Sequence, residues 1–142
     1  MEIKIVVLKE GHLPEYKHTD DCCADCRASL NDTVIIAPRS MVTIPLGFKI
    51  GLPKGYEAQI RPRSGLARKN GVMAVFGTVD AGYIAEVGAT LMNNSDIPFE
   101  INDGDRICQM KIEKKEDISF CLVEELEETE RGLGGFGSTG IK

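Results

Sequence analysis

The sequence of 142 residues is long enough for one domain whose core needs neither disulfides nor a metal. A hydrophobic content of 42%, a charged content of 27% and a net charge of −5 are typical of a soluble protein and argue against a general nucleic-acid-binding protein, which needs a basic face. No apolar run approaches the ~20 residues that span a bilayer, and residues 1–7 lack the layout of a signal peptide, so we expect a cytoplasmic protein.

Short β-branched segments separated by glycine, proline and asparagine dominate the chain, and helical periodicity is nearly absent. Residues 64–69 alone suit a helix, of one or two turns. Strands at this spacing indicate an all-β sandwich, barrel or jelly roll. In chain order we expect strands over residues 3–8, 34–37, 41–44, 48–52, 56–61, 72–76, 83–87, 89–92, 99–101, 107–111 and 119–123.

Three cysteines, Cys22, Cys23 and Cys26, lie close together near the N-terminus. Their spacing allows a zinc site. A zinc site needs four ligands, however, and no second Cys-x-x-Cys pair follows. We therefore favour reduced, mostly buried thiols.

Residues 77–83, with the sequence GTVDAGY, lie between two apolar segments. Glycines permit a tight hairpin that could enclose a small ligand, with the Asp80 carboxylate available as a base. An ordinary acidic turn between two strands has the same pattern.

Two further segments combine arginine with polar side chains. Residues 61–67 leave a strand and open the helix, where free N–H groups beside Arg63 suit a phosphate, although a plain turn would look the same. Residues 104–109 form a turn that leads into a strand containing Arg106 and Gln109, and a buried Arg–Asp pair that pins the turn would explain it equally. Asp25 stands just before a strand.

The chain ends in two unlike segments. Residues 124–130 are an acidic run, which we interpret as a solvated linker. Residues 131–140 are rich in glycine and contain Arg131, Phe136 and two hydroxyl side chains. They form either a flexible tail or a loop that becomes ordered over a nucleotide. In the second case the backbone N–H groups would bind phosphates and Phe136 would stack on the base.

Taken in order, residues 24–28, 63–67, 77–83, 104–109 and 131–140 resemble the five motifs of the trimeric deoxyuridine triphosphatases. The resemblance runs from about residue 25 to residue 140, and its second and fifth motifs are specific. It implies a single dUTPase-like domain over residues 1–142, built as a distorted jelly-roll or β-clip-type barrel with at most one short helix. Residues 124–142 would be a linker and a mobile glycine-rich arm.

The resemblance also implies Mg²⁺-dependent hydrolysis of dUTP to dUMP and pyrophosphate, which keeps uracil out of DNA and supplies dUMP for thymidylate synthesis. Asp80 would deprotonate the water that attacks the α-phosphorus in line. Asp25 would bind the hydration shell of the Mg²⁺ rather than the ion. Tyr83 would pack under the deoxyribose and leave no room for a 2′-hydroxyl.

The other residues that the resemblance assigns to the substrate form three groups. Backbone groups would read uracil at Gly77, Thr78, Val79 and Gly88. Phosphates or ordered water would be held by Arg63, Ser64, Gly65 and Gln109. The arm of a neighbouring subunit in a homotrimer would clasp the substrate with Arg131, Phe136, Gly137, Ser138 and Thr139.

The sequence departs from the family pattern before and after the hairpin. Ala74 stands where an asparagine that contacts uracil is often found, and Ile84-Ala85 replace Arg-Gly. Two alternatives stay open: a dCTP deaminase-like enzyme, which would use an acid–base group such as Glu86 at C4 of cytosine, and a non-catalytic nucleotide-sensing module on the same fold. Retention of Asp80, Tyr83 and the complete glycine-rich tail favours hydrolysis.

Overall fold

The computed structural model of the protein describes residues 1–135 and 139–140. Within them the chain forms ten β-strands and one short helix, α1 (Ser64–Asn70), which confirms the all-β prediction. No helix in this part has the length and apolar content that a membrane-spanning helix needs. In chain order the strands are β1 (Lys4–Val7), β2 (Ala24–Arg27), β3 (Val34–Ile36), β4 (Met41–Gly51), β5 (Tyr56–Arg61), β6 (Val72–Ala74), β7 (Gly77–Val79), β8 (Glu86–Asn93), β9 (Phe99–Ile101) and β10 (Arg106–Lys114).

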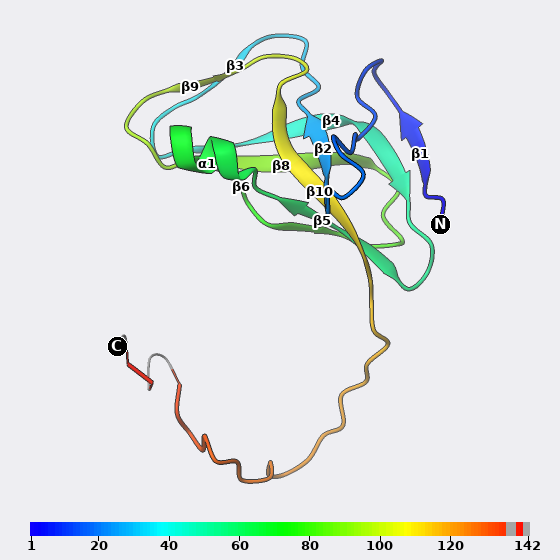
Figure 1. Ribbon diagram of the computed structural model, residues 1–142, viewed down its shortest axis with the longest axis vertical. Coiled ribbons are helices and arrows are strands. Elements are labelled where there is room, and N and C mark those ends of the chain that lie inside the picture. The colour runs from blue at the N-terminus through cyan, green and yellow to red at the C-terminus, as the bar shows by residue number, and fades with distance from the viewer. Residues whose placement is uncertain (136–138, 141–142) are drawn as a thin grey trace.

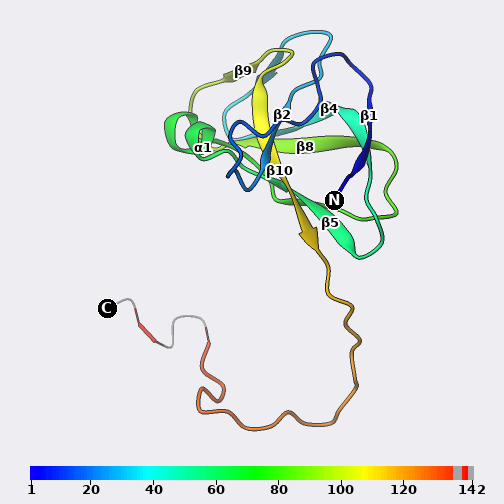
Figure 2. The same ribbon diagram turned by 45° about the vertical axis from the view of Figure 1, so that its right-hand side comes forward.

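The strands build two four-stranded sheets and a two-stranded ribbon (Figure 1). One sheet has the order β1-β4-β8-β6, the other has the order β2-β10-β5-β7, and β3 pairs with β9. The paired strands are antiparallel. In Figures 1 and 2, β8 and β10 cross one another, so each sheet lays its apolar face across that of the other.

The core lies between the two large sheets because apolar residues alternate along the strands. In β5, Ala58 and Ile60 are buried, whereas the residues between them are only partly buried. The largest fully buried side chains come from several strands and include Phe48, Ile44, Leu46, Leu91, Ile101 and Ile107. Because side chains alternate between the two faces of a strand, the polar residues of β5 and β10 lie on the outer face of the second sheet.

β4 is one strand, although the sequence pattern predicts two separate strands over residues 41–44 and 48–52. Pro45 has no N–H and Gly47 has a φ of 75°, and both features normally interrupt a strand. The β4–β8 pairing shifts register between Pro45 and Lys49, so a bulge absorbs the interruption without ending the strand. β8 likewise continues through Gly88, where a break was expected.

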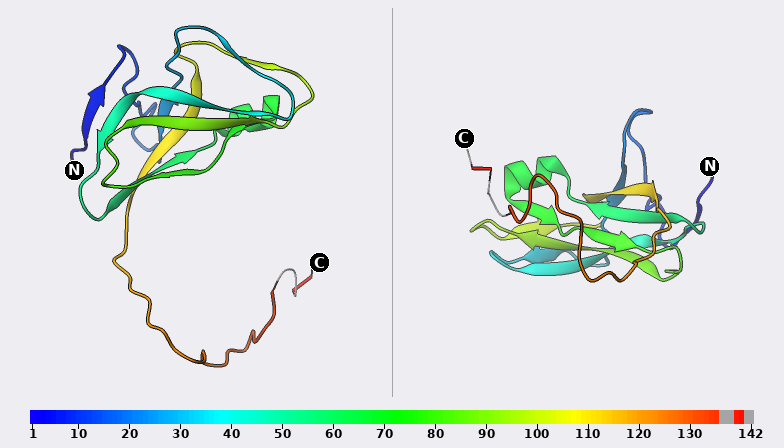
Figure 3. Two further views of the ribbon diagram at one scale, coloured as in Figure 1. Left: turned by 180° about the vertical axis from the view of Figure 1, so that it is seen from behind. Right: turned by 90° about the horizontal axis from the view of Figure 1, so that it is seen from below.

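The predicted strand over residues 119–123 is wrong. The segment is irregular, and the side chains of Phe120 and Leu122 are 96% and 99% exposed. β-branched and aromatic residues favour a strand only where a partner edge is present, and these residues have none among the described strands. Figure 3 shows the chain leaving the end of β10 and running away from the barrel.

Candidate active site

The outer face of the sheet β2-β10-β5-β7 brings separate segments of the sequence into one polar surface. Strand register aligns Asp25 with Gln109 and Gln109 with Arg61, so the three side chains form a row across three strands. Asp25 was expected just before a strand, but it lies inside β2 and pairs with β10. This pairing places the first, second and fourth sequence motifs beside one another.

Asp25 is the centre of an ion-pair cluster on this face. One carboxylate oxygen accepts a hydrogen bond from Nε of Arg63 at 3.0 Å, and the other accepts one from Nη1 of Arg106 at 3.0 Å. Arg63 also donates through Nη1 to the backbone oxygen of Arg106 at 2.9 Å. Arg106 thus pairs with Asp25 of another strand, and not with an aspartate of its own turn as in the alternative considered for residues 104–109. Asp105 instead accepts a hydrogen bond from the backbone N–H of Asn102.

The start of α1 adjoins this cluster. Arg63 has an extended backbone at the N-cap position, and Ser64 begins the helix with an exposed side chain. Gly65 leaves open space where a side chain would stand. Nε2 of Gln109 donates to the backbone oxygen of Pro62 at 2.9 Å, which ties β10 to the residues before the helix. Four predicted phosphate-binding residues thus lie together.

Residues 77–83 consist of β7 and the turn that follows it, which leads into the other sheet, so they do not form the predicted hairpin. β7 pairs with β5, whereas β8 pairs with β4 and β6, so the two strands that flank the turn belong to different sheets. The backbone N–H of Tyr83 donates to the oxygen of Asp80 at 2.9 Å and closes the turn. The tyrosine hydroxyl donates to the backbone oxygen of Glu86 at 2.8 Å.

The turn opens a small cavity between β7 and β8. Its volume is about 260 Å³, and it is lined by Thr78, Val79, Asp80, Tyr83, Val87 and Gly88. Five of these six residues were predicted to contact the base, the sugar or the attacking water, so the structure brings them together; Gly77 begins β7 just before them. The Asp80 side chain is exposed at this cavity.

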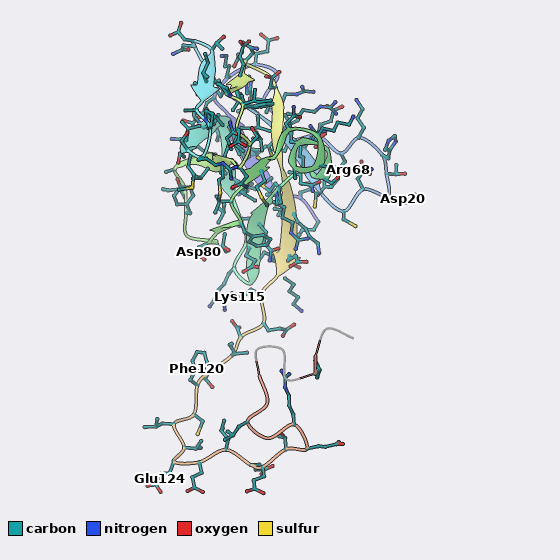
Figure 4. The ribbon with its side chains drawn as sticks, turned by 90° about the vertical axis from the view of Figure 1, so that its left-hand side faces the viewer. Asp20, Arg68, Asp80, Lys115, Phe120 and Glu124 are labelled. Carbon is teal, nitrogen blue, oxygen red and sulfur yellow. The ribbon has the colours of Figure 1, made fainter. Side chains whose placement is uncertain are left out.

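The cavity and the arginine cluster are separated within one chain. Asp80 follows β7, level with the start of β5, whereas Asp25 is level with the end of β5 and three strands away. Strand and residue spacings put about 20 Å between them. Figure 4 shows Asp80 at the lower end of the barrel and Arg68, on α1, on the opposite side.

The C-terminal segment is described in part. Nε of Arg131 donates to the backbone oxygen of Gly134 at 2.8 Å within a local turn, and Thr139 is exposed. Phe136, Gly137 and Ser138, which were predicted to contact substrate, lie outside the described residues. The described residues from 116 to 132 are exposed along their length (Figure 4).

Ala74 was noted in the sequence for replacing an asparagine. It is 1% exposed and pairs with Leu91 of β8, so its side chain faces the core and not the cavity. Two residues that make contacts at these sites were absent from the predicted substrate site: Arg106, which donates to Asp25, and Glu86, whose backbone oxygen accepts from the Tyr83 hydroxyl. The Arg106–Asp25 pair depends on the register of β2 against β10, which no local pattern reveals, whereas the Tyr83–Glu86 contact lies within three residues of sequence.

The five cysteines are free thiols. Cys26 and Cys108 face one another across β2 and β10, and a hydrogen bond between the thiols together with burial raises the pKa of Cys26. Burial also raises the pKa of Cys23. Protonated thiols are poor metal ligands, and within the described residues no group of three or more His, Cys, Asp or Glu side chains is placed to hold a metal ion.

Together, the fold and these features define an all-β protein with a cluster of two arginines around Asp25 and a separate cavity of about 260 Å³. Comparison with known proteins gives the family. The dUTPase family model matches residues 9–140. The deoxyuridine 5′-triphosphate nucleotidohydrolase of Finegoldia magna is 42% identical over 142 residues, which cover 99% of each chain. That of Treponema denticola is 46% identical over 137 residues, 94% of this chain and 95% of the other.

Solved structures agree. The G164S mutant of the dUTPase of Staphylococcus bacteriophage 80alpha, solved with dUpNHpp, superposes with a TM-score of 0.88 at 25% identity, and the match covers 99% of each chain. The chain belongs to the dUTPase family, as the five motifs predicted. It is a hydrolase that acts on a nucleoside triphosphate.

Proposed function

We propose that the protein hydrolyses dUTP to dUMP and pyrophosphate, with Mg²⁺, in sites assembled from three copies of the chain. The observation that carries the proposal is the division of the site. The nucleoside cavity with Asp80 and the phosphate-binding cluster around Arg63 have complementary chemistry, yet about 20 Å separates them on one chain. A triphosphate that touches both must lie between neighbouring copies.

The cavity suits a deoxyuridine. β7 pairs with β5 alone among the described strands, so backbone groups of Gly77–Val79 on its other edge are available to a base. Gly88 on the facing strand lets a flat ring approach the backbone. Donors and acceptors at fixed spacing would distinguish uracil from cytosine, whose edge has the opposite polarity. Tyr83 would lie under the sugar.

Asp80 would act as the general base. Its carboxylate is exposed at the cavity rim, where it can orient a water for in-line attack on the α-phosphorus and accept its proton. Arg63 and the hydroxyl of Ser64 would stabilise the charge that develops on the leaving pyrophosphate. Gly65 would leave room for a phosphate, and Gln109 would contact a phosphate or a water.

The residues around Asp25 fit a water-mediated Mg²⁺ site. Both carboxylate oxygens already accept a guanidinium hydrogen bond, and the side chain is 18% exposed, which leaves acceptor positions for metal-bound water rather than for the ion. Mg²⁺ on the phosphates would neutralise part of their charge.

The C-terminal segment would come from a third copy. Its described part leaves the barrel and is exposed, which is the arrangement required of an arm that reaches a neighbour. Arg131 and the hydroxyls of Ser138 and Thr139 would hold the outer phosphates, Phe136 would stack on uracil, and Gly137 would let the backbone approach. Free thiols fit a reducing compartment such as the cytoplasm, where this activity would keep uracil out of DNA and supply dUMP.

The structure disfavours the deaminase alternative. Glu86, which would have to act at C4 of cytosine, accepts a hydrogen bond from the backbone N–H of Gly47 at 3.0 Å and is only partly exposed. A carboxylate engaged in this way holds the backbone and does not face the cavity lined by Asp80 and Tyr83.

The test is pyrophosphate release from dUTP, dCTP, dTTP and UTP in the presence of Mg²⁺, with Asp80→Asn as the matched variant. We expect release from dUTP to be far more efficient than from the other three nucleotides, and a loss of at least ~100-fold in Asp80→Asn, while dUTP binding persists. Ammonia release from dCTP would support the deaminase, binding without turnover would support the sensing module, and undiminished turnover in Asp80→Asn would remove the base role.

A further inference from the structure

Glu86 joins two parts of the fold that meet at the nucleoside cavity. Its side chain, at the start of β8, accepts a hydrogen bond from the backbone N–H of Gly47 in β4. Its backbone oxygen accepts the hydroxyl hydrogen bond of Tyr83 at 2.8 Å. A single residue therefore connects the bulge of β4 to the tyrosine that lines the cavity.

The bulge is a firm anchor. Because the β4–β8 register shifts between Pro45 and Lys49, the N–H of Gly47 is directed to the Glu86 carboxylate instead of the strand ladder. The oxygen of Gly47 accepts the N–H of Leu8 at 2.8 Å. A Cβ on Gly47 would stand 3.0 Å from the side chain of His12, so the backbone is closely packed here.

The turn that carries Tyr83 has few other anchors, since Ala81 packs against the core but the residues around it are exposed. Gly82 has open space around it, and Ile84 is 77% exposed. The Tyr83 side chain is itself 43% exposed in one chain. Among the described contacts, its closing backbone hydrogen bond to Asp80 lies inside the turn, whereas the hydroxyl bond to Glu86 reaches outside it.

We propose that Glu86 is a positioning residue for sugar discrimination: it fixes Tyr83 against the cavity and so sets how strongly a 2′-hydroxyl is excluded. The inference rests on the proposed function of the cavity. A steric wall rejects one extra oxygen only if it cannot retreat by about 1 Å, since hydrophobic pockets that merely crowd a hydroxyl discriminate weakly. The contacts through Glu86 supply the stiffness that the turn lacks.

The experiment compares kcat/KM for dUTP and for UTP in wild-type protein and in four single variants. Glu86→Ala removes the acceptor of the Gly47 N–H, and Tyr83→Phe removes the hydrogen bond from the tyrosine hydroxyl to Glu86. We expect each change to lower the ratio of kcat/KM for dUTP to kcat/KM for UTP about tenfold, mainly because UTP is hydrolysed more efficiently. The double variant should fall no further, because both changes break one series of contacts. Glu86→Gln keeps an acceptor oxygen and should stay near the wild-type ratio.

The matched control is Thr90→Val. Oγ1 of Thr90 and Oγ1 of Thr43 share a hydrogen bond of 2.9 Å across the same two strands, β4 and β8, and neither lines the cavity. Loss of this bond should leave the ratio unchanged.

An unchanged ratio in Glu86→Ala, an equal loss for both substrates, or independent effects in the double variant would overturn the role of Glu86. If circular dichroism shows that Glu86→Ala does not fold, Glu86→Asp replaces it. The aspartate keeps the charge but is too short to reach the Gly47 N–H, so a dUTP/UTP ratio equal to that of the wild type would overturn the proposal. Wild-type protein that releases no pyrophosphate from dUTP would overturn the proposed function itself, which separates the two failures.

Discussion

At the residue scale, the surroundings of Asp25 decide how it can serve a metal-dependent site. Two guanidinium groups occupy both of its oxygens, so its charge is largely shared before any cation approaches. This arrangement favours contact through water. Arg63 would contribute twice, because it orients Asp25 and keeps an unused nitrogen for a phosphate.

Asp103 offers a pH test at the same scale. The hydrogen bond from Lys9, with the two charged atoms 2.7 Å apart, lowers the pKa of Asp103. Its folded-state pKa is then below the unfolded value of ~3.9, so its stabilisation is present at neutral pH and is lost as the pH falls through the folded pKa. We expect Asp103→Asn to be less stable at pH 7 and to lose less stability below about pH 4.

Urea unfolding of both proteins between pH 3 and pH 7 measures this difference. Parallel curves over the whole range would show that Asp103 has the same proton affinity in the folded and the unfolded chain.

At the element scale, the bulge in β4 can be tested with two glycines of similar conformation. Gly47 has a φ of 75° and Gly55 a φ of 85°, but a Cβ on Gly47 would meet His12 and Ser29 at 3.0 Å, whereas Gly55 has open space. Both alanine substitutions should lower the free energy of unfolding by ~1–2 kcal/mol, because alanine is strained in a left-handed backbone conformation. Gly47→Ala should lose a further ~1–3 kcal/mol of unfolding free energy through crowding.

Denaturant titration of the two variants checks this prediction. Equal losses would mean that the loop around His12 yields easily and that the bulge is not a firm anchor.

The C-terminal segment provides a second test at this scale. Its residues from 116 to 132 are exposed, and Arg131 bonds locally to Gly134, so a chain that ends at Glu130 should fold normally. Because the removed residues would hold the outer phosphates and cover the base, we expect turnover to fall by at least ~100-fold while the melting temperature changes little.

Calorimetry and pyrophosphate release on the truncated chain measure both effects. Arg131→Ala is the matched single change and should lose part of the same activity. Normal hydrolysis by the truncated chain would remove the segment from the site.

At the scale of the whole molecule, the distance between Asp80 and the arginine cluster predicts complementation. Asp80→Asn and Ser64→Ala each damage one half of the site, and in a mixed trimer some sites draw both intact halves from different chains. Random mixing in equal amounts should leave about a quarter of the sites complete.

The measurement is pyrophosphate release after the two inactive variants are unfolded and refolded together, with each variant refolded alone as the control. Activity no higher than the sum of the controls would place each site within one chain.

The sequence by itself determined much of the fold and of the candidate site. Alternation along the strands, the glycines of residues 77–83 and the order of the five motifs were enough to predict an all-β fold, one short helix and the family. Asp80, Tyr83 and Gly88 were all predicted, and the structure places them at one cavity. These features are local, since period, turn chemistry and motif order are properties of neighbouring residues.

Only the tertiary structure decided what depends on pairing. It placed Asp25 inside a strand between Arg63 and Arg106, assigned β7 and β8 to different sheets, and left residues 119–123 without a partner strand. Each outcome depends on strand register between residues far apart in the chain, and a local pattern does not encode a distant partner. The role of Glu86 became visible for the same reason, because its contact with Gly47 exists only once the bulge shifts the register of β4 against β8.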